Sequence, residues 1–368
     1  MTRFRDLGLT VGLLPPGPGN AITDVEGVRV GMTTVISGEA DASDLRVART
    51  GVTVIVPNED VGAAPVFAGC HRLNGNGELT GLEWIRESGL LTTPVAITNT
   101  HSVGVVRDAI VAADMDRRPE PRDLWSLPVV GETYDGPLND INGFHVTATH
   151  LRQALAAVSP GPVPEGNVGG GTGMICHEFK GGTGTASRTV NGWTVGALVQ
   201  ANHGRRERLT VDGVPVGREL TTEVVPSPFD QPSDAGSGSI IVVVATDAPL
   251  LPHQVARLAQ RAGLGVARVG GGGEHSSGDL FLAFSTANGG RISSAEDDDA
   301  VEPVQVTMLP DAAISDLFWA TIEATEEAIL NALVAAETMT GRGGTTAHAL
   351  DHTRLLEVMT RYHRGPRT

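Results

Sequence analysis

Lysine is nearly absent from this 368-residue sequence: of its 27 basic residues, only Lys180 is a lysine. An enzyme that forms a Schiff base with its substrate or with pyridoxal phosphate would have to use that one residue. The sequence also lacks the Gly-Lys pair of phosphate-binding loops and the Gly-x-Gly-x-x-Gly pattern of dinucleotide-binding folds. We therefore expect no cofactor.

Cysteine and long apolar runs are also scarce. Cys70 and Cys176 are the only cysteines, which excludes a disulfide framework and is typical of a reducing compartment. No run of about 18 apolar residues is present, so no membrane span is predicted. The N-terminus with its apolar stretch 7–14 superficially resembles a signal peptide, but the stretch is short, is broken by Gly8, Thr10 and Gly12, and is not followed by a small-x-small cleavage site. These observations predict a cytoplasmic protein that does not bind membranes.

Two common catalytic motifs are missing as well. There is no His-Glu-x-x-His motif, and the 11 histidines are scattered, so we expect no metal. The Gly-x-Ser-x-Gly motif of α/β-hydrolases is absent. The net charge of −16 repels phosphate backbones, which argues against nucleic acid as a partner.

The sequence does contain alternating strand and helix patterns, which predict an α/β protein. Strands are expected at 51–56, 94–98, 193–199, 240–246 and 280–285. Helices are expected at 250–262, ending at Gly263, and at 312–338, where an amphipathic helix would cover a sheet. The acidic run 296–299 is expected to be a solvated loop.

One junction stands out. A segment rich in Pro, Gly, Ser and Asp, residues 226–238, runs directly into the continuously apolar strand that follows Ser239. Glycine at 238 leaves its own carbonyl, which precedes Ser239, unshielded, and the strand would hold the Ser239 hydroxyl rigidly. This arrangement suits self-cleavage, in which the hydroxyl attacks that carbonyl and hydrolysis leaves serine at a new N-terminus. The freed α-amine, with an ordinary pKa of about 7.7–8.0, would then be a base beside the nucleophile.

The residues around this junction resemble those of the DmpA-type L-aminopeptidase/D-esterase and β-aminopeptidase family, whose members are self-processing N-terminal-serine hydrolases. The nucleophile region of that family is similar to residues 238–252. Other blocks agree in the same order along the chain: 22–31, 73–81, 132–143, 169–173, 199–204 and 276–288. The resemblance covers the chain almost from end to end.

The resemblance implies an αββα four-layer sandwich, like that of N-terminal-nucleophile hydrolases but with different connectivity. It also implies one catalytic domain, residues 1–368, cut between Gly238 and Ser239 into an α chain (1–238) and a β chain (239–368). The αβ units of such enzymes assemble into homo-oligomers, commonly tetramers.

Residue roles follow from the same resemblance. Ser239 is the expected nucleophile, and Ser277 matches the second serine, which contacts the nucleophile. Asp279 matches an acidic residue that orients Ser277 or holds the α-ammonium. Without the resemblance, Ser-Ser-Gly-Asp would be interpreted as a polar turn before a strand.

A second group of residues is expected around the substrate. Asn202 matches the residue whose amide donates to the tetrahedral oxyanion, a task that suits a neutral group because it does not titrate. Tyr134 matches a tyrosine that lines the same region. Glu132 and Asn142 are candidates for binding the substrate's amine.

The expected activity is therefore removal of an N-terminal amino acid from short peptides, amides or esters with a free amine, through an acyl-enzyme on Ser239. Whether L-α-, D-α- or β-amino acids are preferred depends on the pocket shape. Two alternatives remain at this point: an acyltransferase similar to ornithine acetyltransferases, which use threonine, and an unprocessed binding protein with the same fold. Gly236–Ser237 is a rival cleavage bond, but its serine would not adjoin the strand.

Overall fold

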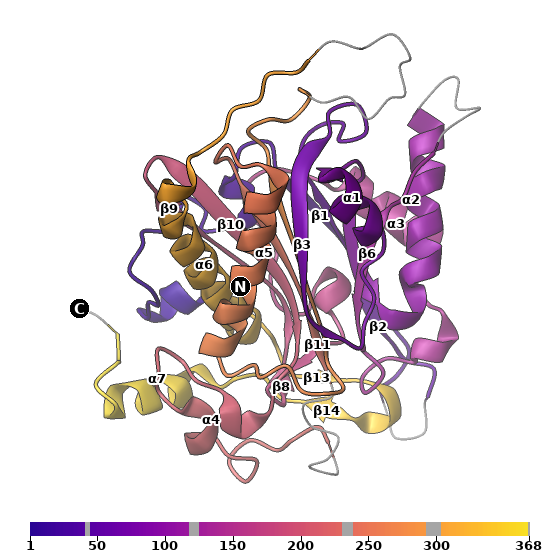
Figure 1. Ribbon diagram of the computed structural model, residues 1–368. Helices are drawn as coiled ribbons and strands as arrows, with labels where there is room; N and C mark the ends of the chain where they lie inside the picture. Colours follow the sequence, from indigo (N-terminus) through magenta and orange to yellow (C-terminus); the bar gives the residue numbers. More distant parts are fainter. Residues whose placement is uncertain (41–44, 118–124, 230–237, 292–302, 367–368) are drawn as a thin grey trace.

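Two β-sheets form the centre of the protein in the computed structural model, which describes residues 1–40, 45–117, 125–229, 238–291 and 303–366. A four-stranded sheet has the order β1-β2-β5-β6, and a six-stranded sheet has the order β4-β3-β12-β11-β10-β9 (Figure 1). The strands of these sheets are β1 (Arg29–Ser37), β2 (Ala48–Val56), β3 (Val66–Gly75), β4 (Leu90–Leu91), β5 (Val95–Asn99), β6 (Val129–Thr133), β9 (Gly182–Val190), β10 (Trp193–Asn202), β11 (Ser239–Thr246) and β12 (Gly278–Ser285). Short hairpins are formed by β7 (Ile175–Cys176) with β8 (Phe179–Lys180) and by β13 (Met339–Thr340) with β14 (Thr346–Ala347).

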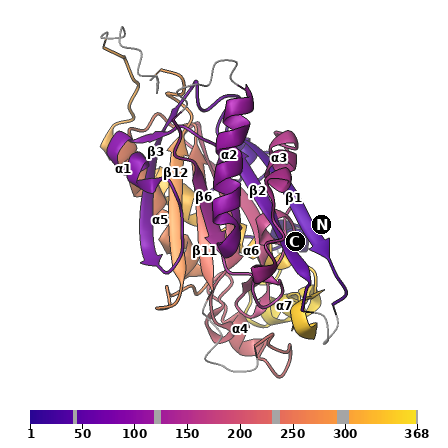
Figure 2. The same ribbon diagram turned by 90° about the vertical axis from the view of Figure 1, so that its right-hand side faces the viewer.

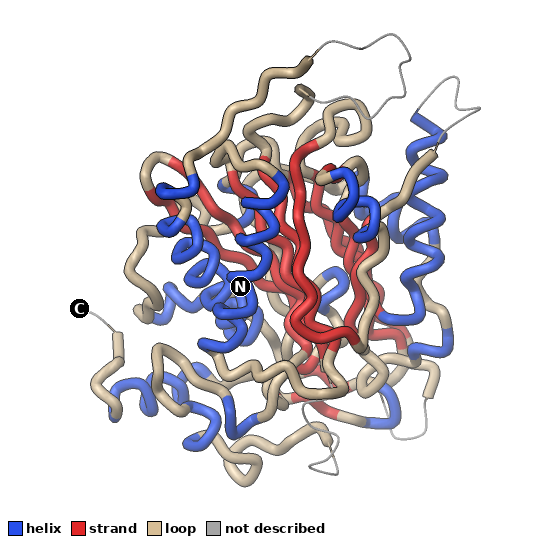
Figure 3. Tube along the Cα trace, in the orientation of Figure 1, coloured by secondary structure: helices blue, strands red, loops and turns tan. Residues whose placement is uncertain are grey.

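Helices cover the outer face of each sheet. The long helices α5 (Pro252–Arg268) and α6 (Ser315–Val334) pack on the six-stranded sheet, and α2 (Val103–Arg117) and α3 (Ala148–Ala156) pack on the four-stranded sheet. Figure 2 shows these layers edge-on, and Figure 3 shows the helices outside the strands. The remaining helices are α1 (Leu82–Ser88), α4 (Val216–Glu219) and α7 (His352–Arg361). The expected αββα sandwich is confirmed.

The central strand β11 is buried on both faces because it lies between two separate apolar layers. Ile241 and Val243 pack between the two sheets, whereas Ile240, Val242 and Val244 pack under α5 and α6. This burial confirms the interpretation of the continuous apolar run. The other four expected strands are also present, each longer or shifted by one to three residues at its ends.

The prediction that the helix beginning near residue 250 ends at Gly263 is wrong, because α5 continues to Arg268. Its glycines are needed for packing. A Cβ at Gly265 would lie 2.6 Å from Thr325 Cβ on α6, and one at Gly263 would lie 3.2 Å from Phe281 on β12. The glycines therefore let α5 approach both neighbours closely and do not end the helix.

Helix α6 also differs from the expected amphipathic cover, since it is buried nearly all round. Its acidic residues Glu323 and Glu327 bind the fully buried guanidinium of Arg188 at 3.2 and 2.7 Å. Glu327 also pairs with Arg5 at 2.7 Å, which fastens the N-terminal segment over the helix. Removing one partner of such a buried pair leaves an uncompensated charge.

Some expectations concern residues that the structure does not describe. The acidic run 296–299 and the rival bond Gly236–Ser237 both lie outside the described residues. Among the residues that are described, no helix is long and apolar enough to cross a membrane.

Candidate active site

Ser239 is the first residue of the central strand β11, and its side chain is held by the neighbouring strand. The residue is only 4 % exposed, and its Oγ accepts a hydrogen bond of 2.9 Å from the main-chain N–H of Gly278, the first residue of β12. Position 278 has no room for a side chain, because a Cβ there would lie 2.4 Å from the Asn76 carbonyl oxygen. The sequence motif Ser-Gly-Asp thus brings a main-chain donor to the serine, which sequence reasoning did not predict.

Ser277 and Asp279 flank that donor and are hydrogen-bonded to each other. The Ser277 hydroxyl donates to the Asp279 carboxylate at 2.6 Å, and both residues are buried. Burial raises the pKa of Asp279 to about 6, although hydrogen bonds from Ser277 and from the Ile240 main chain oppose the shift. The carboxyl group therefore lies beside the Ser239–Ile240 peptide and also orients Ser277. The hydrogen bond given to Ser239 Oγ comes from Gly278 between them.

Asn202 ends β10 directly opposite Ser239 in the antiparallel register. Two hydrogen bonds fix its amide: Oδ1 accepts from Ile175 N–H at 2.7 Å, and Nδ2 donates to the Tyr134 carbonyl at 2.9 Å. One hydrogen of Nδ2 is thereby left for another acceptor. A Cβ placed on Gly238 would lie 3.2 Å from this nitrogen, so the amide lies beside the Gly238–Ser239 peptide.

Tyr134 and Asn142 do not direct their side chains to the site in the way that the sequence suggested. Tyr134 contributes its main-chain carbonyl to Asn202, while its side chain is 48 % exposed. Asn142 is exposed in a short turn, Ile141–Gly143. The residue after this turn, Phe144, stacks on His101 with ring centroids 6.1 Å apart.

Glu132, near the end of β6, is a buried carboxylate close to the same centre. It accepts hydrogen bonds from the Glu78 N–H at 2.9 Å and from the Thr100 hydroxyl. Burial raises its pKa, and these hydrogen bonds partly oppose the shift. A Cβ on Gly77 would lie 3.0 Å from Glu132 Oε1 and 3.2 Å from Gly278 Cα, which places the carboxylate next to the strand that holds Ser239.

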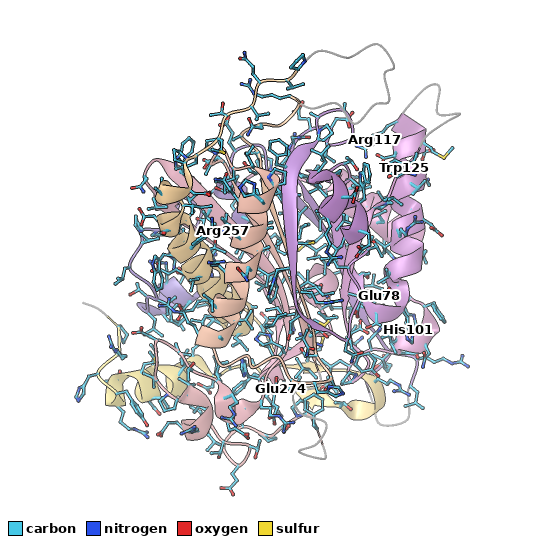
Figure 4. The ribbon with its side chains drawn as sticks, in the orientation of Figure 1. Glu78, His101, Arg117, Trp125, Arg257 and Glu274 are labelled. Carbon is cyan, nitrogen blue, oxygen red and sulfur yellow. The ribbon has the colours of Figure 1, made fainter. Side chains whose placement is uncertain are left out.

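The segment after β3 joins these parts by crossing from one sheet to the other. Asn76 binds the loop before β12 through its N–H to the Ser277 carbonyl and through Nδ2 to the Ser276 carbonyl. Three residues later, Leu79 bridges to Gly131 on β6. In Figure 4, Glu78, which belongs to this crossing segment, lies beside His101 on the right, and Glu274 lies at the lower centre. The Asn-Gly-Asn-Gly motif carried the resemblance, but its linking role was not visible in the sequence.

Asp135 is another residue that sequence reasoning missed. It is fully buried next to Tyr134, where its Oδ1 accepts from Asn139 Nδ2 at 3.0 Å. Burial raises its pKa to about 6, against hydrogen bonds from Thr50, Asn139 and Asn99. Its main-chain carbonyl also accepts from the N–H groups of Leu138 and Asn139. These bonds fix the turn whose Tyr134 carbonyl orients Asn202.

One group of side chains has the composition of a metal site. The candidate ligand atoms of Cys176, His177 and His203 lie within 4.8 Å of one another, and all three residues are buried. Burial raises the pKa of the Cys176 thiol to about 12 and lowers that of His177 to about 4, so these groups are neutral. The set offers only three ligands, and the cationic Lys180 and Arg206 lie beside it, which disfavours a divalent ion. We assign no metal to it.

The arrangement is suited to acyl transfer. A rigidly held hydroxyl, a main-chain N–H, and a neutral amide with a free hydrogen converge on the Gly238–Ser239 peptide, with two buried carboxylates nearby. Such groups can supply a nucleophile, an oxyanion donor and a counter-charge for an ammonium group. Fold and site together define a hydrolase in which a serine begins a central strand of two stacked sheets.

Comparisons with known proteins agree with this class. The sequence matches Peptidase family S58 over residues 20–347. It is 48 % identical to a β-peptidyl aminopeptidase, BapA, of Sphingosinicella microcystinivorans, covering 98 % of this chain and 93 % of that protein. The structure is similar to a β-aminopeptidase of Burkholderia sp., with a TM-score of 0.91, 56 % identity, and coverage of 98 % and 99 % of the two chains.

A third relative connects the fold to its class. The L-aminopeptidase D-Ala-esterase/amidase of Ochrobactrum anthropi, described as a prototype serine aminopeptidase with a variant of the Ntn hydrolase fold, matches with a TM-score of 0.88 and 48 % identity. The match covers 98 % of this chain and 99 % of that one. The protein belongs to peptidase family S58 and is an aminopeptidase. This result confirms the resemblance found in the sequence and supports an enzyme over a non-enzymatic binding protein.

The raised pKa of Asp279 predicts that this site reduces stability. The carboxyl group ionises less readily in the folded chain than in the unfolded chain. The ionised carboxylate therefore lowers the free energy of unfolding; this loss of stability is fully present above pH 6 and disappears below about pH 4. In a Ser239→Ala chain, Asp279→Asn should therefore raise the free energy of unfolding at pH 7.5 by up to about 3 kcal/mol. Urea denaturation measures the free energy of unfolding of the two chains at pH 7.5, and again below about pH 4, where the difference between them should disappear.

The exposed residue Glu357 of α7 provides the control, and Glu357→Gln should leave stability unchanged within about 0.5 kcal/mol. An Asp279→Asn chain that was less stable than its parent at pH 7.5 would contradict this assignment.

Proposed function

We propose that the chain cuts itself between Gly238 and Ser239 and that the mature enzyme uses Ser239 as an N-terminal nucleophile. The observation that carries the proposal is the position of the Ser239 hydroxyl: it is fixed at the start of β11 by Gly278 N–H, with the Asn202 amide beside the same peptide bond. The α chain would comprise residues 1–238 and the β chain residues 239–368, of about 25 and 13 kDa by share of the 38.2 kDa mass.

Self-cleavage proceeds in two steps. The Ser239 oxygen bonds to the Gly238 carbonyl carbon, the C–N bond breaks, and the nitrogen takes the hydroxyl proton, which leaves an ester. Water then hydrolyses the ester, which gives the Gly238 carboxylate and restores the Ser239 hydroxyl beside the α-amine freed in the first step. The close approach of Gly238 to the Asn202 main chain supports this geometry: a Cβ at 238 would lie 1.6 Å from the Asn202 carbonyl oxygen.

The same groups serve turnover. The neutral α-amine accepts the Ser239 hydroxyl proton, the oxygen attacks the substrate carbonyl, and the leaving amine takes that proton as the acyl-enzyme forms. Water then releases the amino acid. Asn202 donates to the oxyanion, and Asp279 orients Ser277 and the amine that begins β11.

The proposed substrates are short peptides, amides or esters with a free N-terminal amine. The buried Glu132 carboxylate next to the crossing segment supports recognition of that amine as an ammonium, with Asn142 nearby in sequence and Tyr134 at the rim. The names of the relatives support including peptides that begin with β-amino acids.

The proposal extends to the setting of the enzyme. Both cysteines are free, which supports a reducing, cytoplasmic location. Because the sequence resembles a family whose αβ units assemble, we also propose that this enzyme forms a homo-oligomer of αβ units. Light scattering of the purified protein tests this assembly.

The first prediction concerns the cleavage site. The purified protein should give two bands on a denaturing gel, and N-terminal sequencing of the smaller one should begin Ser-Ile-Ile, residues 239–241. Ser239→Ala should stay a single inactive chain, and Gly238→Ala should block cleavage because its Cβ collides with Asn202. A smaller fragment that begins Ser-Gly-Ser would show cleavage at Gly236–Ser237 instead.

The second prediction concerns the oxyanion donor. Asn202→Ala should fold and lose about 10²–10³-fold in kcat, roughly 2.7–4 kcal/mol, with a much smaller change in KM. Self-cleavage should slow as well, since it passes through an oxyanion at the same place. Steady-state kinetics on an amino-acid p-nitroanilide measures the effect, and a kcat within a few-fold of wild type would rule out the assigned role.

The third prediction concerns pH and the substrate's amine. Activity should rise with pH through the pKa of the Ser239 α-amine, near 8 if unperturbed and lower if desolvated, because only the neutral amine accepts a proton. It should fall at higher pH as the substrate's ammonium loses its proton. This bell-shaped pH profile of activity should be unchanged by EDTA. N-acetylated substrates should not be turned over, because their blocked amine cannot bind as an ammonium group. The Glu132→Gln variant should bind the substrate's amine more weakly. Efficient turnover of N-acetylated peptides would reject this mechanism.

A further inference from the structure

The only lysine of the chain is fully buried close to the oxyanion donor. Lys180 lies in the hairpin β7–β8, and its Nζ donates to the carbonyl oxygens of Gly181 at 2.8 Å and Met174 at 2.9 Å, with Gly171 at 3.5 Å. The three acceptors match the three N–H donors of an ammonium group. The side chain is therefore unsuited to a Schiff base, and its charge is directed into the local main chain.

The Met174 carbonyl leads from Lys180 to Asn202. It belongs to the same peptide unit as the Ile175 N–H, and that N–H donates to Asn202 Oδ1 at 2.7 Å. The two amide groups thus lie in series: the ammonium polarises the Met174–Ile175 peptide, and this peptide polarises the Asn202 side-chain amide. Chains of hydrogen bonds in a low-dielectric interior strengthen one another in this way.

We propose that Lys180 is a positioning residue that orients the Asn202 amide and, through the Met174–Ile175 peptide, makes its Nδ2–H a stronger donor to the oxyanion. Lys180 does not touch the reacting atoms. It acts through Asn202, so this inference rests on the oxyanion role given to Asn202 in the proposed function.

The electrostatic surroundings allow the charge to act on Asn202. Burial lowers the pKa of Lys180 to about 7, and Cys176 is the titratable neighbour whose negative form would raise it. Burial raises the pKa of that thiol to about 12, so it stays neutral. His177 and His203, each with a ring nitrogen within 4.8 Å of the Cys176 thiol, are neutral because burial lowers their pKa values. The ammonium form of Lys180 is present below its pKa and is lost as the pH rises through it.

The first test is a double-mutant cycle on kcat per processed molecule. Lys180→Met should lower kcat about tenfold, less than the 10²–10³-fold loss for removing the donor itself, and leave KM within about twofold. In an Asn202→Ala background, Lys180→Met should change kcat by less than about twofold, because the group through which it acts is gone. Additive losses in the double variant would overturn the proposal.

Arg206 supplies a matched control. It is also a buried cation bonded to main-chain carbonyls, including those of His177 and Leu220, but no bond links it to Asn202 among the described residues. Arg206→Met should lower thermal stability and leave kcat per folded, processed molecule unchanged. Equal losses of kcat in both variants would indicate a purely structural role for Lys180.

The pH dependence separates charge from packing. The ratio of wild-type kcat to Lys180→Met kcat should be largest below the Lys180 pKa and fall as the pH rises through it, because the neutral amine no longer polarises the peptide. The Ser239 amine, the substrate amine, Asp279 and Asp135 titrate in both proteins, so the ratio removes every contribution of theirs that is the same with and without Lys180. A ratio independent of pH would overturn the role of the charge.

A measurement without turnover distinguishes this inference from the proposed function. In an asparagine-labelled Ser239→Ala chain, the side-chain amide resonances of Asn202, assigned by Asn202→Ala, should shift as Lys180 titrates, and that shift should vanish in Lys180→Met. Were the shift present while Asn202→Ala left kcat intact, the polarisation would stand and the oxyanion role would fail. Were no such shift seen in a folded Ser239→Ala chain, the inference would fail whatever the function. Because this titration is observed in a chain that keeps Lys180, it does not depend on Lys180→Met folding.

Discussion

The antiparallel pairing of Asn202 with Ser239 is the constraint on which the site depends. The register between β10 and β11 places an amide and a hydroxyl opposite each other at the same end of two central strands. Because both strands are buried on both faces, neither can slip without moving an apolar side chain into the wrong layer. The apolar layers therefore set the geometry of the polar groups at the strand ends.

Each polar group at this end is then fixed by the main chain of another element. Gly278 N–H holds the serine, Ile175 N–H and the Tyr134 carbonyl hold the amide, and Glu78 N–H holds Glu132. Main-chain partners are well suited to this task because strands and hairpins fix their positions. The glycines at 77, 238 and 278 let these segments approach closely, since a Cβ at each would meet a neighbouring atom at 3.0 Å or less.

The same burial that organises the site has an energetic cost. Asp279, Glu132 and Asp135 are all held where burial raises their pKa values, and Lys180 where burial lowers its own. The stabilising charge pairs lie elsewhere, between α6, Arg188 and the N-terminal segment. The network under α6 keeps the pKa of Glu327 below its ordinary value despite burial, chiefly through Arg5 and Arg188. The charge pairs that stabilise the fold and the carboxylates of the site are thus different sets of residues.

Local patterns in the sequence were enough to predict the strand that begins at Ser239, the presence of the helices that follow it, and the family. The reason is that an apolar run or a short motif involves only residues that are close together in the chain. The resemblance also named Ser239, Asn202, Ser277 and Asp279, which the structure brings to one place. The sequence did not reveal that Gly278 and Ile175 supply main-chain donors, that α5 continues through Gly263, or that α6 buries its glutamates. It also did not reveal that the Lys180 ammonium donates to the Met174 carbonyl, next to the Ile175 N–H that binds Asn202. These features depend on contacts between residues far apart in the chain, and only the packing of the two sheets and their helices decides which of those groups meet.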